Sequence, residues 1–281
     1  MKNMNNRTPA DNYIEVVQKE SLKCLETFMR ACEVKNLNYF LFFGSLLGAI
    51  RHKGFIPWDD DIDIAMPRAD YDRFVEEYGE HYFSDDYFLD GYNCAQYLNG
   101  QPNVRIDFKH LLIRKDKESC VSYHNAFISI FPIDGLPDNK IRCKIHIFMT
   151  KLLYGLLRLS RSAHSDVDKL PNRSMKEKFL IKIHKIIPIG KLVSPRLIAQ
   201  TYNKYRSRYD YKKTKNAIAS WDNNIYMSET MTNFQKVPFD NLSCMIPSGW
   251  DAILKVLYGN YMELPPLKNR MPEHGVELVW K

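Results

Sequence analysis

The sequence predicts an α+β protein, in which a mixed β-sheet is flanked by helices and joined to an additional basic helical region. Residues 13–35 place apolar side chains at helical spacing, which is typical of an amphipathic helix. Residues 61–66 (DIDIAM) alternate charged and apolar side chains, the period of a strand with one polar face. From Lys140 onward, longer segments with broad apolar stripes and basic faces indicate further helices.

Composition agrees with a globular fold. The 281 residues are 45% hydrophobic and 26% charged, which excludes a disordered chain, a collagen-like chain and a disulfide scaffold. Six cysteines, at positions 24, 32, 94, 120, 143 and 244, include no CxxC pair and have no histidine partners at metal spacing. We therefore expect reduced thiols that mainly contribute to packing.

Apolar runs and turn signals divide the first half of the chain into alternating strands and helices. Residues 39–43 (YFLFF) are a short aromatic run typical of a buried strand, and a Gly-Ser turn and short helix follow it. Pro67 suits the first turn of the next helix. In order, the expected elements are a helix over 13–35, a strand over 39–43, a helix ending at Gly54, a strand over 61–66, a helix over 67–82, and strands over 103–115 and 126–134.

The second half begins with helices and ends in mixed structure. Three helical segments are expected at 145–159, 178–193 and 194–209, followed by short strands around 217–222 and 237–248 and a helix over 250–262 that ends at Leu-Pro-Pro. No internal repeat or low-complexity linker is present. We divide the chain into a core at 1–139, a basic helical region at 140–215 and a C-terminal part at 216–281 that completes the site.

The formal net charge of +7 is distributed unevenly. Residues 140–215 contain 20 basic and four acidic residues, whereas the rest of the chain contains 20 basic and 29 acidic residues. Helices with Lys144, Lys151, Arg158 and Arg161 at their faces suit an anionic membrane surface or a solvated helical subdomain, and both interpretations stay open. No groove-reading motif is present, so we expect no nucleic-acid partner.

Two further patterns bear on location. No apolar run approaches the length of a spanning helix, and the first residues lack the apolar core of a signal peptide. We expect a cytoplasmic protein, with a peripheral position on the inner face of the cytoplasmic membrane as an open alternative.

The chemistry is concentrated in residues 44–66. Gly44 and Ser45 form a flexible turn after a buried strand, which leaves backbone N–H groups free to approach a phosphate. Asp61 and Asp63 lie two apart in a strand and so share a face, where two carboxylates repel each other unless a cation lies between them. A hard divalent ion would relieve that repulsion, whereas the simpler interpretation is a solvated acidic pair.

Three blocks of the sequence resemble the LicD phosphocholine transferase family, which includes the fukutin-related sugar-phosphate transferases. They are residues 46–74 (LLGAIRHKGFIPWDDDIDIAMPRADYDRF), residues 131–138 (FPIDGLPD) and a C-terminal block over 237–274. The resemblance implies a nucleotidyltransferase-like fold over 1–139. It also implies transfer of phosphocholine or a similar phospho-alcohol from a CDP-linked donor, such as CDP-choline, to a glycan hydroxyl, with release of CMP.

The resemblance also implies residue roles. Asp61 and Asp63 would hold Mg²⁺ or Mn²⁺ against the donor diphosphate, with Asp59 and Asp60 just before the strand and Asp60 facing away from the ion. The expected contacts to phosphate come from Gly44, Ser45, Arg51, His52, Lys53, Lys268, Arg270 and His274, and Arg51 is preferred because a guanidinium engages two oxygens. The acceptor would be a cell-surface glycan or teichoic-acid precursor, with a lipid-linked carrier as one option.

One position departs from the family pattern. The third carboxylate of this fold would fall at Ser129 in FISIFPIDG, and serine is a weak metal ligand and a poor base at neutral pH. Asp107 or Asp134 would then act as the base, and Asp107 is slightly preferred for its strand alternation. Loss of activity, which would leave a silent glycan- or membrane-binding protein, is a third possibility.

Two further questions stay open. A choline headgroup requires aromatic faces, for which Trp58, Tyr92, Tyr97 and Trp221 are candidates, although most rings in this chain must be ordinary packing. A nucleotidyltransferase that adds a nucleoside monophosphate to a small hydroxylated acceptor is the alternative enzyme, since the Gly-Ser turn and paired aspartates also serve that chemistry.

Overall fold

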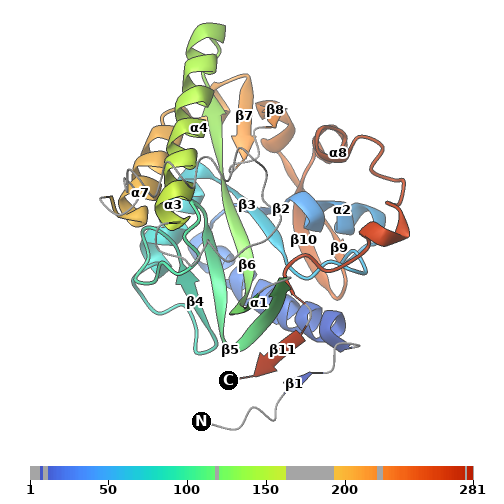
Figure 1. The fold of residues 1–281 in the computed structure, drawn as a ribbon. Helices are drawn as coiled ribbons and strands as arrows, with labels where there is room; N and C mark the ends of the chain where they lie inside the picture. Colours follow the sequence, from blue (N-terminus) through green and yellow to red (C-terminus); the bar gives the residue numbers. More distant parts are fainter. Residues whose placement is uncertain are drawn as a thin grey trace.

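The computed structural model describes residues 7–8, 12–117, 120–162, 193–219, 224–275 and 277–280. The expected helix at 178–193 lies almost entirely outside these residues. Within the described ranges, nine strands form one mixed sheet, and two more form a separate hairpin. The predicted α+β class is confirmed, with helices on both sides of the sheet (Figure 1).

The elements follow the expected order, with some strands added. The strands of the main sheet are β1 (Arg7–Thr8), β2 (Phe40–Leu41), β3 (Asp63–Pro67), β4 (Tyr87–Asp90), β5 (Val104–Lys117), β6 (Cys120–Leu136), β7 (Asn216–Ala219), β8 (Ile225–Met227) and β11 (Glu277–Trp280). The separate hairpin is β9 (Phe234–Phe239) and β10 (Leu242–Pro247). The α-helices are α1 (Tyr13–Lys35), α2 (Phe43–Arg51), α3 (Arg68–Tyr78), α4 (Lys140–Ser162), α7 (Pro195–Arg206) and α8 (Trp250–Tyr258), and short 3-10 helices occur at Tyr211–Lys213, Ser228–Met231 and Leu267–Asn269.

The centre of the sheet runs in the order β11-β5-β6-β3-β2. The β3 and β6 strands are parallel, whereas β5 and β6 form a long antiparallel hairpin with a register shift between Asp107 and Leu112. Parallel strands need a crossover connection, and here α3, β4 and β5 lie in sequence between β3 and β6.

One face of the sheet is buried in a hydrophobic core. Ile62, Ile64 and Met66 are fully buried in the same core as Phe28 of α1 and Phe74 of α3, whose rings pack edge to face at 5.2 Å. Alternation along a strand places Asp63 on the opposite face from Ile62 and Ile64. The core thus fixes which face of the sheet carries the carboxylates.

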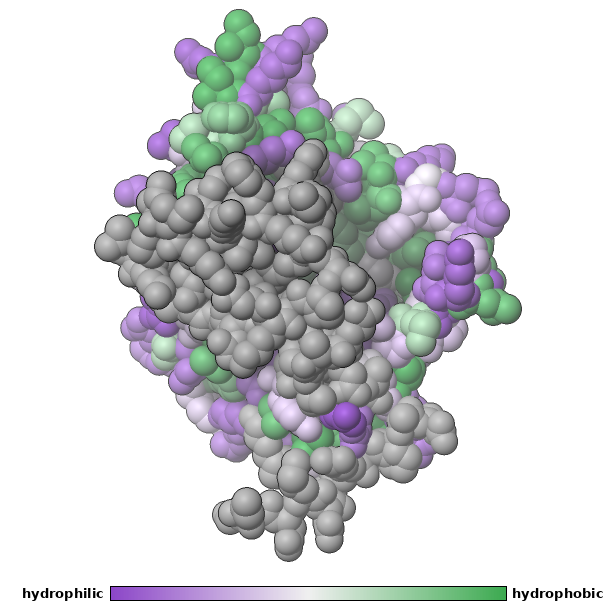
Figure 2. Space-filling model, viewed as in Figure 1, coloured by the Kyte–Doolittle hydropathy of each residue, from purple (hydrophilic) through white to green (hydrophobic). Residues whose placement is uncertain are grey.

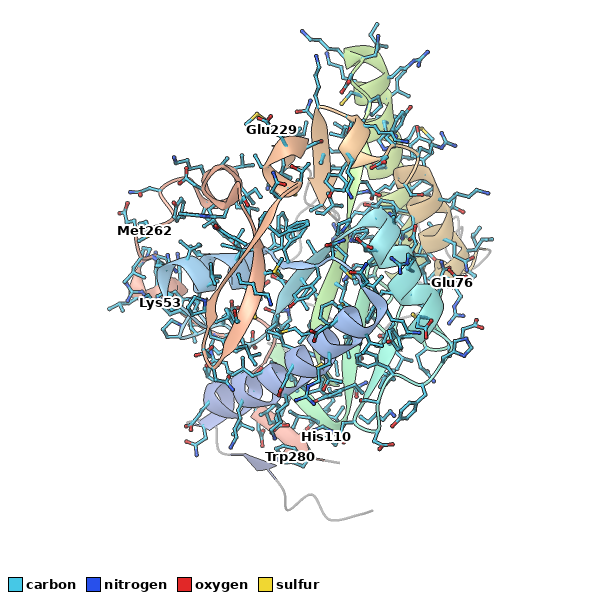
Figure 3. All side chains as sticks on the ribbon, turned by 180° about the vertical axis from the view of Figure 1, so that it is seen from behind. Lys53, Glu76, His110, Glu229, Met262 and Trp280 are labelled. Atoms are coloured by element: carbon cyan, nitrogen blue, oxygen red, sulfur yellow. The ribbon has the colours of Figure 1, made fainter. Side chains whose placement is uncertain are left out.

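The other elements cluster at the edges. The α2 helix lies beside β9 and α8, and α4 stands out from the body with α7 packed along it (Figure 1). At the far end, His110 of β5 stacks on Trp280 of β11 with ring centroids 5.6 Å apart (Figure 3). No helix among the described residues has the length and apolar character required to span a bilayer.

Two boundaries differ from the expectations for a local reason. The apolar run at 39–43 yields only a two-residue strand, because α2 already begins at Phe43. The β3 strand begins at Asp63, so Asp61 precedes it, although the Ile62 carbonyl still accepts a hydrogen bond from the Ser129 N–H at 2.8 Å. Cys24, Cys32, Cys94, Cys143 and Cys244 are free thiols, as expected.

Candidate active site

Gly44 and Ser45 lie in the first turn of α2, and not in a separate turn before the helix as expected, and they form one hydrogen-bonded unit with Asp63. The Asp63 N–H donates to Ser45 Oγ at 2.9 Å, and the Gly44 N–H donates to the Asp63 carboxylate. A Cβ on Gly44 would lie 2.8 Å from Asp59 Oδ2, so only glycine lets that carboxylate approach the turn. Phe43, one residue earlier, has a φ of 42°, a conformation that bulky residues rarely adopt. The turn is thus held in a specific and strained shape against the aspartates.

Asp59, Asp61 and Asp63, which we call the acid cluster, are poorly compensated carboxylates. Burial and the charge of neighbouring acids raise the pKa of Asp59 to about 8 and that of Asp63 well above its usual range. Burial also raises the pKa of Asp61 to about 6, against the opposing effect of His274. Buried acids raise each other's pKa when no cation is close enough to balance them.

The acid cluster lacks a complete set of metal ligands from the protein. Among the described residues, no three His, Cys, Asp or Glu side chains are grouped closely enough to hold an ion. Two hard carboxylates that need a counter-charge nevertheless suit Mg²⁺ or Mn²⁺, which are often bound through one or two carboxylates together with substrate phosphates. The donor set therefore fits the expected metal only together with a phosphorylated substrate.

Asp60 points away from the acid cluster and anchors the C-terminal loop. Its carboxylate accepts hydrogen bonds from the Tyr13 hydroxyl at 2.7 Å, from the His274 N–H at 2.9 Å and from the Gly275 N–H at 3.1 Å. His274 Nδ1 lies 3.0 Å from Asp60 Oδ1, and His274 Nε2 lies 3.7 Å from Asp61 Oδ2. Burial lowers the pKa of His274, but the hydrogen bond to Asp60 and the charge of Asp61 outweigh it and raise the pKa to about 9. The protein thus supplies one cation beside Asp61.

Ser129 occupies the position expected for the third carboxylate. It pairs with Asp63 across the parallel β3–β6 ladder and with Arg105 across the antiparallel β5–β6 ladder. Paired residues on neighbouring strands point to the same face, so Asp63, Ser129 and Arg105 form a row across the sheet. The strand alternation of VRIDF could have identified Arg105, which the sequence analysis missed.

Asp107 lies on the same face as this row and is held by two partners. Its Oδ2 accepts hydrogen bonds from Arg105 Nη2 and Asn125 Nδ2, both at 3.1 Å, whereas its buried Oδ1 has no hydrogen-bond partner among the described residues. Burial raises the pKa of Asp107 to about 6, although Arg105 opposes the shift. Arg105 also contacts the Phe127 ring, and that ring packs edge to face on His274 at 5.0 Å. These contacts connect Asp107 to the side of the site that carries His274.

Asp134 lies on the opposite face of the sheet from Ser129. Arg68 donates to it through two hydrogen bonds of 2.7 and 2.8 Å, and Arg206 Nε lies 3.2 Å from its Oδ2. Burial raises the pKa of Asp134, but the two guanidinium groups outweigh burial and lower it below its usual range. Arg68 also lines a polar cavity of about 530 Å³ between α3 and α7. The structure therefore does not bring Asp134 to the acid cluster.

Of the expected cations, two arginines are held by hydrogen bonds and two lysines are exposed. Arg51 donates to the Tyr261 carbonyl at 2.8 Å and to His52 Nε2 at 3.0 Å, and Arg270 donates to the Pro265 carbonyl at 2.8 Å. Burial and the charge of Arg270 lower the pKa of Arg51, against the effect of Tyr258. Lys53 and Lys268 are exposed.

The four candidate choline-binding rings do not form one cage. Tyr92 and Tyr97 pack in a small cluster with Leu157 and Ala199. Trp58 instead packs against the main core, and Arg270 Cζ lies 5.5 Å from the centroid of its ring. Trp221 lies outside the described residues. Tyr258 of α8 is a further ring near the site, since burial and then the charges of Asp63, Asp59 and Asp61 raise the pKa of its hydroxyl.

The chain is similar to a described protein family and to several known proteins. Residues 36–127 match the family model described as LicD/FKTN/FKRP, nucleotidyltransferase domain. The chain is 28% identical over 273 residues to the lipopolysaccharide cholinephosphotransferase LicD of Haemophilus influenzae, covering 90% of this chain and 92% of that protein. Short segments are similar to uncharacterized proteins of Rickettsia typhi (49% over 41 residues, 15% of this chain and 13% of that protein) and Rickettsia prowazekii (51% over 35 residues, 12% and 13%).

Proposed function

We propose that this protein transfers phosphocholine, or a related phospho-alcohol, from a CDP-linked donor to a glycan hydroxyl, because residues 36–127 match the model of a LicD-type nucleotidyltransferase domain. The observation that supports it best is the hydrogen-bonded unit of Gly44, Ser45 and Asp63 beside the poorly compensated carboxylates of Asp59 and Asp61. The full-length similarity to a lipopolysaccharide cholinephosphotransferase supports the choice of transferred group. The acceptor would be a cell-surface glycan or teichoic-acid precursor, carried on a lipid or free.

Donor binding would use the charges of the site. Asp61 and Asp63 would hold Mg²⁺ or Mn²⁺, which when bound neutralises the diphosphate and stabilises departing CMP. The protonated His274 lies beside Asp61 and adds a fixed positive charge. Arg51 and Arg270 bring two guanidiniums to the loop after α8, where they would neutralise further phosphate charge.

Asp107 is our choice of general base. Its Oδ2 is fixed by Arg105 and Asn125, whereas Oδ1 is buried, so the site would have to open for Oδ1 to accept the proton of the acceptor hydroxyl. A pKa of about 6 keeps it ionised at neutral pH yet still basic enough to take a proton in the transition state. The hydroxyl oxygen would bond to phosphorus as the bond to the CMP oxygen breaks, and the proton would pass from Asp107 to water.

The test is a product assay with matched donors. The protein is incubated with CDP-choline, Mg²⁺ and lipopolysaccharide or a lipid-linked glycan, and CMP and the mass of the glycan are measured. We expect CMP and phosphocholine-modified glycan in equal amounts, and no product from CTP or ATP. Pyrophosphate release from CTP or ATP would favour the nucleotidyltransferase, and no turnover with several CDP-alcohols and acceptors would favour the silent protein suggested by Ser129.

A matched pair of variants connects the activity to the site. Asp63→Asn removes one carboxylate of the acid cluster, whereas Asp86→Asn removes an exposed carboxylate between α3 and β4. We expect the first to lower turnover by at least a hundredfold and the second to leave it unchanged. Full activity of Asp63→Asn would exclude the proposed role of the acid cluster.

A further inference from the structure

The α4 helix carries a row of exposed apolar side chains. Ile141, Ile145, Phe148 and Leu152, which we call the apolar stripe, are 70%, 54%, 65% and 46% exposed. Their spacing of four, three and four residues places them on one side of the helix. A stripe of large apolar side chains on a projecting helix is unusual for a surface in contact only with water.

The opposite side of α4 is already occupied. His146, Thr150 and Leu157 are buried, and the His146 ring stacks on Tyr205 of α7 with centroids 4.9 Å apart. Packing against α7 therefore fixes the rotation of α4 and presents the apolar stripe outward. Figure 2 shows hydrophobic side chains at the projecting end of α4, bordered by hydrophilic ones.

The charge on α4 has one sign. Residues 140–162 contain six Lys or Arg residues and no Asp or Glu. Lys140, Lys144, Lys151 and Arg158, which we call the basic edge, repeat at intervals of four and seven residues and so follow one border of the apolar stripe. All four are exposed, and none makes an ion pair with another residue in the described part of the chain.

We propose that α4 docks this protein on an anionic lipid bilayer, with the apolar stripe inserted among the acyl chains and the basic edge against the lipid phosphates. An apolar strip bordered by cations is the pattern of interfacial helices, because the strip gains from burial while the cations meet the headgroups. A symmetric dimer through α4 and α7 would bring basic edges together without acids to balance them, because neither helix contains Asp or Glu. The docking surface does not depend on the proposed transfer reaction.

Vesicle sedimentation with the full chain tests the proposal without donor or acceptor. We expect binding to phosphatidylglycerol vesicles at low salt, little binding to phosphatidylcholine vesicles, and release from the anionic vesicles as salt is raised. Ile145→Ser with Phe148→Ser should weaken binding at least tenfold. Lys144→Glu with Lys151→Glu should weaken it by about fivefold or more per charge removed.

Matched controls lie on other elements. Val34→Ser with Tyr82→Ser removes two exposed apolar side chains, and Lys19→Glu with Lys236→Glu makes the same change in net charge on α1 and β9. Thermal unfolding checks that every variant is folded, and light scattering measures the oligomeric state. The proposal is overturned if the wild type does not bind anionic vesicles at low salt, if α4 variants and controls bind equally, or if the α4 variants instead abolish a dimer.

Discussion

Ser129 on β6 lies directly opposite Asp63 on β3 in the parallel register of the two strands. The side chain that neighbours the acid cluster at this point is therefore a hydroxyl instead of a third carboxylate. On the other side of Ser129, Arg105 of β5 pairs with it across the sheet, so the residue that follows Ser129 in the row is a cation. For this reason the base in our proposal is Asp107, which lies two residues after Arg105 on the same face of β5.

Replacing Ser129 with Asp tests what that position contributes. A third carboxylate beside Asp63 adds like-charge repulsion, so we expect Ser129→Asp to lower stability by about 2 kcal/mol in the presence of a chelator, roughly 5 °C in Tm. With Mg²⁺ or Mn²⁺ the loss should be recovered, giving a larger metal-dependent rise in Tm than the wild type shows. Ser129→Ala is the control and should respond to metal as the wild type does. An equal metal response in all three proteins would argue against metal binding at Asp63.

The roles of Asp107 and Asp134 can be distinguished by whether replacement with Asn lowers turnover or stability. Asp107→Asn keeps hydrogen-bonding capacity toward Arg105 but cannot accept a proton, so turnover should fall by about 10²–10⁴-fold with little change in Tm. Steady-state rates and thermal unfolding of the same samples check this. Unchanged turnover in Asp107→Asn would remove it as the base.

Asp134→Asn should instead unfold the protein more easily. It leaves Arg68 and Arg206 without their buried counter-charge, which costs about 3–5 kcal/mol by urea unfolding at neutral pH. Because the folded-state pKa of Asp134 is lowered, its contribution is fully present above the unfolded pKa of about 3.9 and is lost as pH falls through the folded-state value. The wild type should therefore lose this increment in strong acid, while Asp134→Asn, having no such carboxyl, should show a shallower acid dependence. Parallel acid profiles of the two proteins would contradict the assignment.

The sequence was sufficient to place the helices of the described residues and the strand that carries Asp63, but not to choose between Asp107 and Asp134. The apolar spacing of residues 13–35 predicts α1 correctly because an amphipathic helix is a local pattern. Asp107 and Asp134 both follow strand alternation, and what separates them is Arg206, 72 positions beyond Asp134, which no local pattern connects to it. The Asp60 anchor to His274 spans 214 positions and was beyond prediction for the same reason.

Gly44→Ala tests whether the turn must admit Asp59. The new Cβ would lie 2.8 Å from Asp59 Oδ2, so either the carboxylate or the turn must shift. We expect at least a hundredfold loss of turnover with a stability change of about 1–2 kcal/mol, because the displaced turn also carries the contacts to Asp63. Gly155→Ala on α4 is the matched control, since nothing lies within 4 Å of its new Cβ. That variant should keep full turnover and gain up to about 1 kcal/mol of stability.

The hydrogen bonds that the Asp60 carboxylate accepts should control how firmly the C-terminal loop is held. Asp60 accepts from Tyr13 and from the backbone of His274 and Gly275, so Asp60→Ala removes every one of these contacts and leaves the loop without its anchor. Trypsin should then cleave after Lys268 and Arg270 at least tenfold faster than in the wild type, because proteolysis follows local opening. Tyr13→Phe removes a single hydrogen bond and keeps the backbone contacts. Its cleavage rate should therefore lie between that of the wild type and that of Asp60→Ala. If Asp60→Ala is cleaved no faster than Asp86→Asn, the loop is held by other contacts and His274 is not positioned by Asp60.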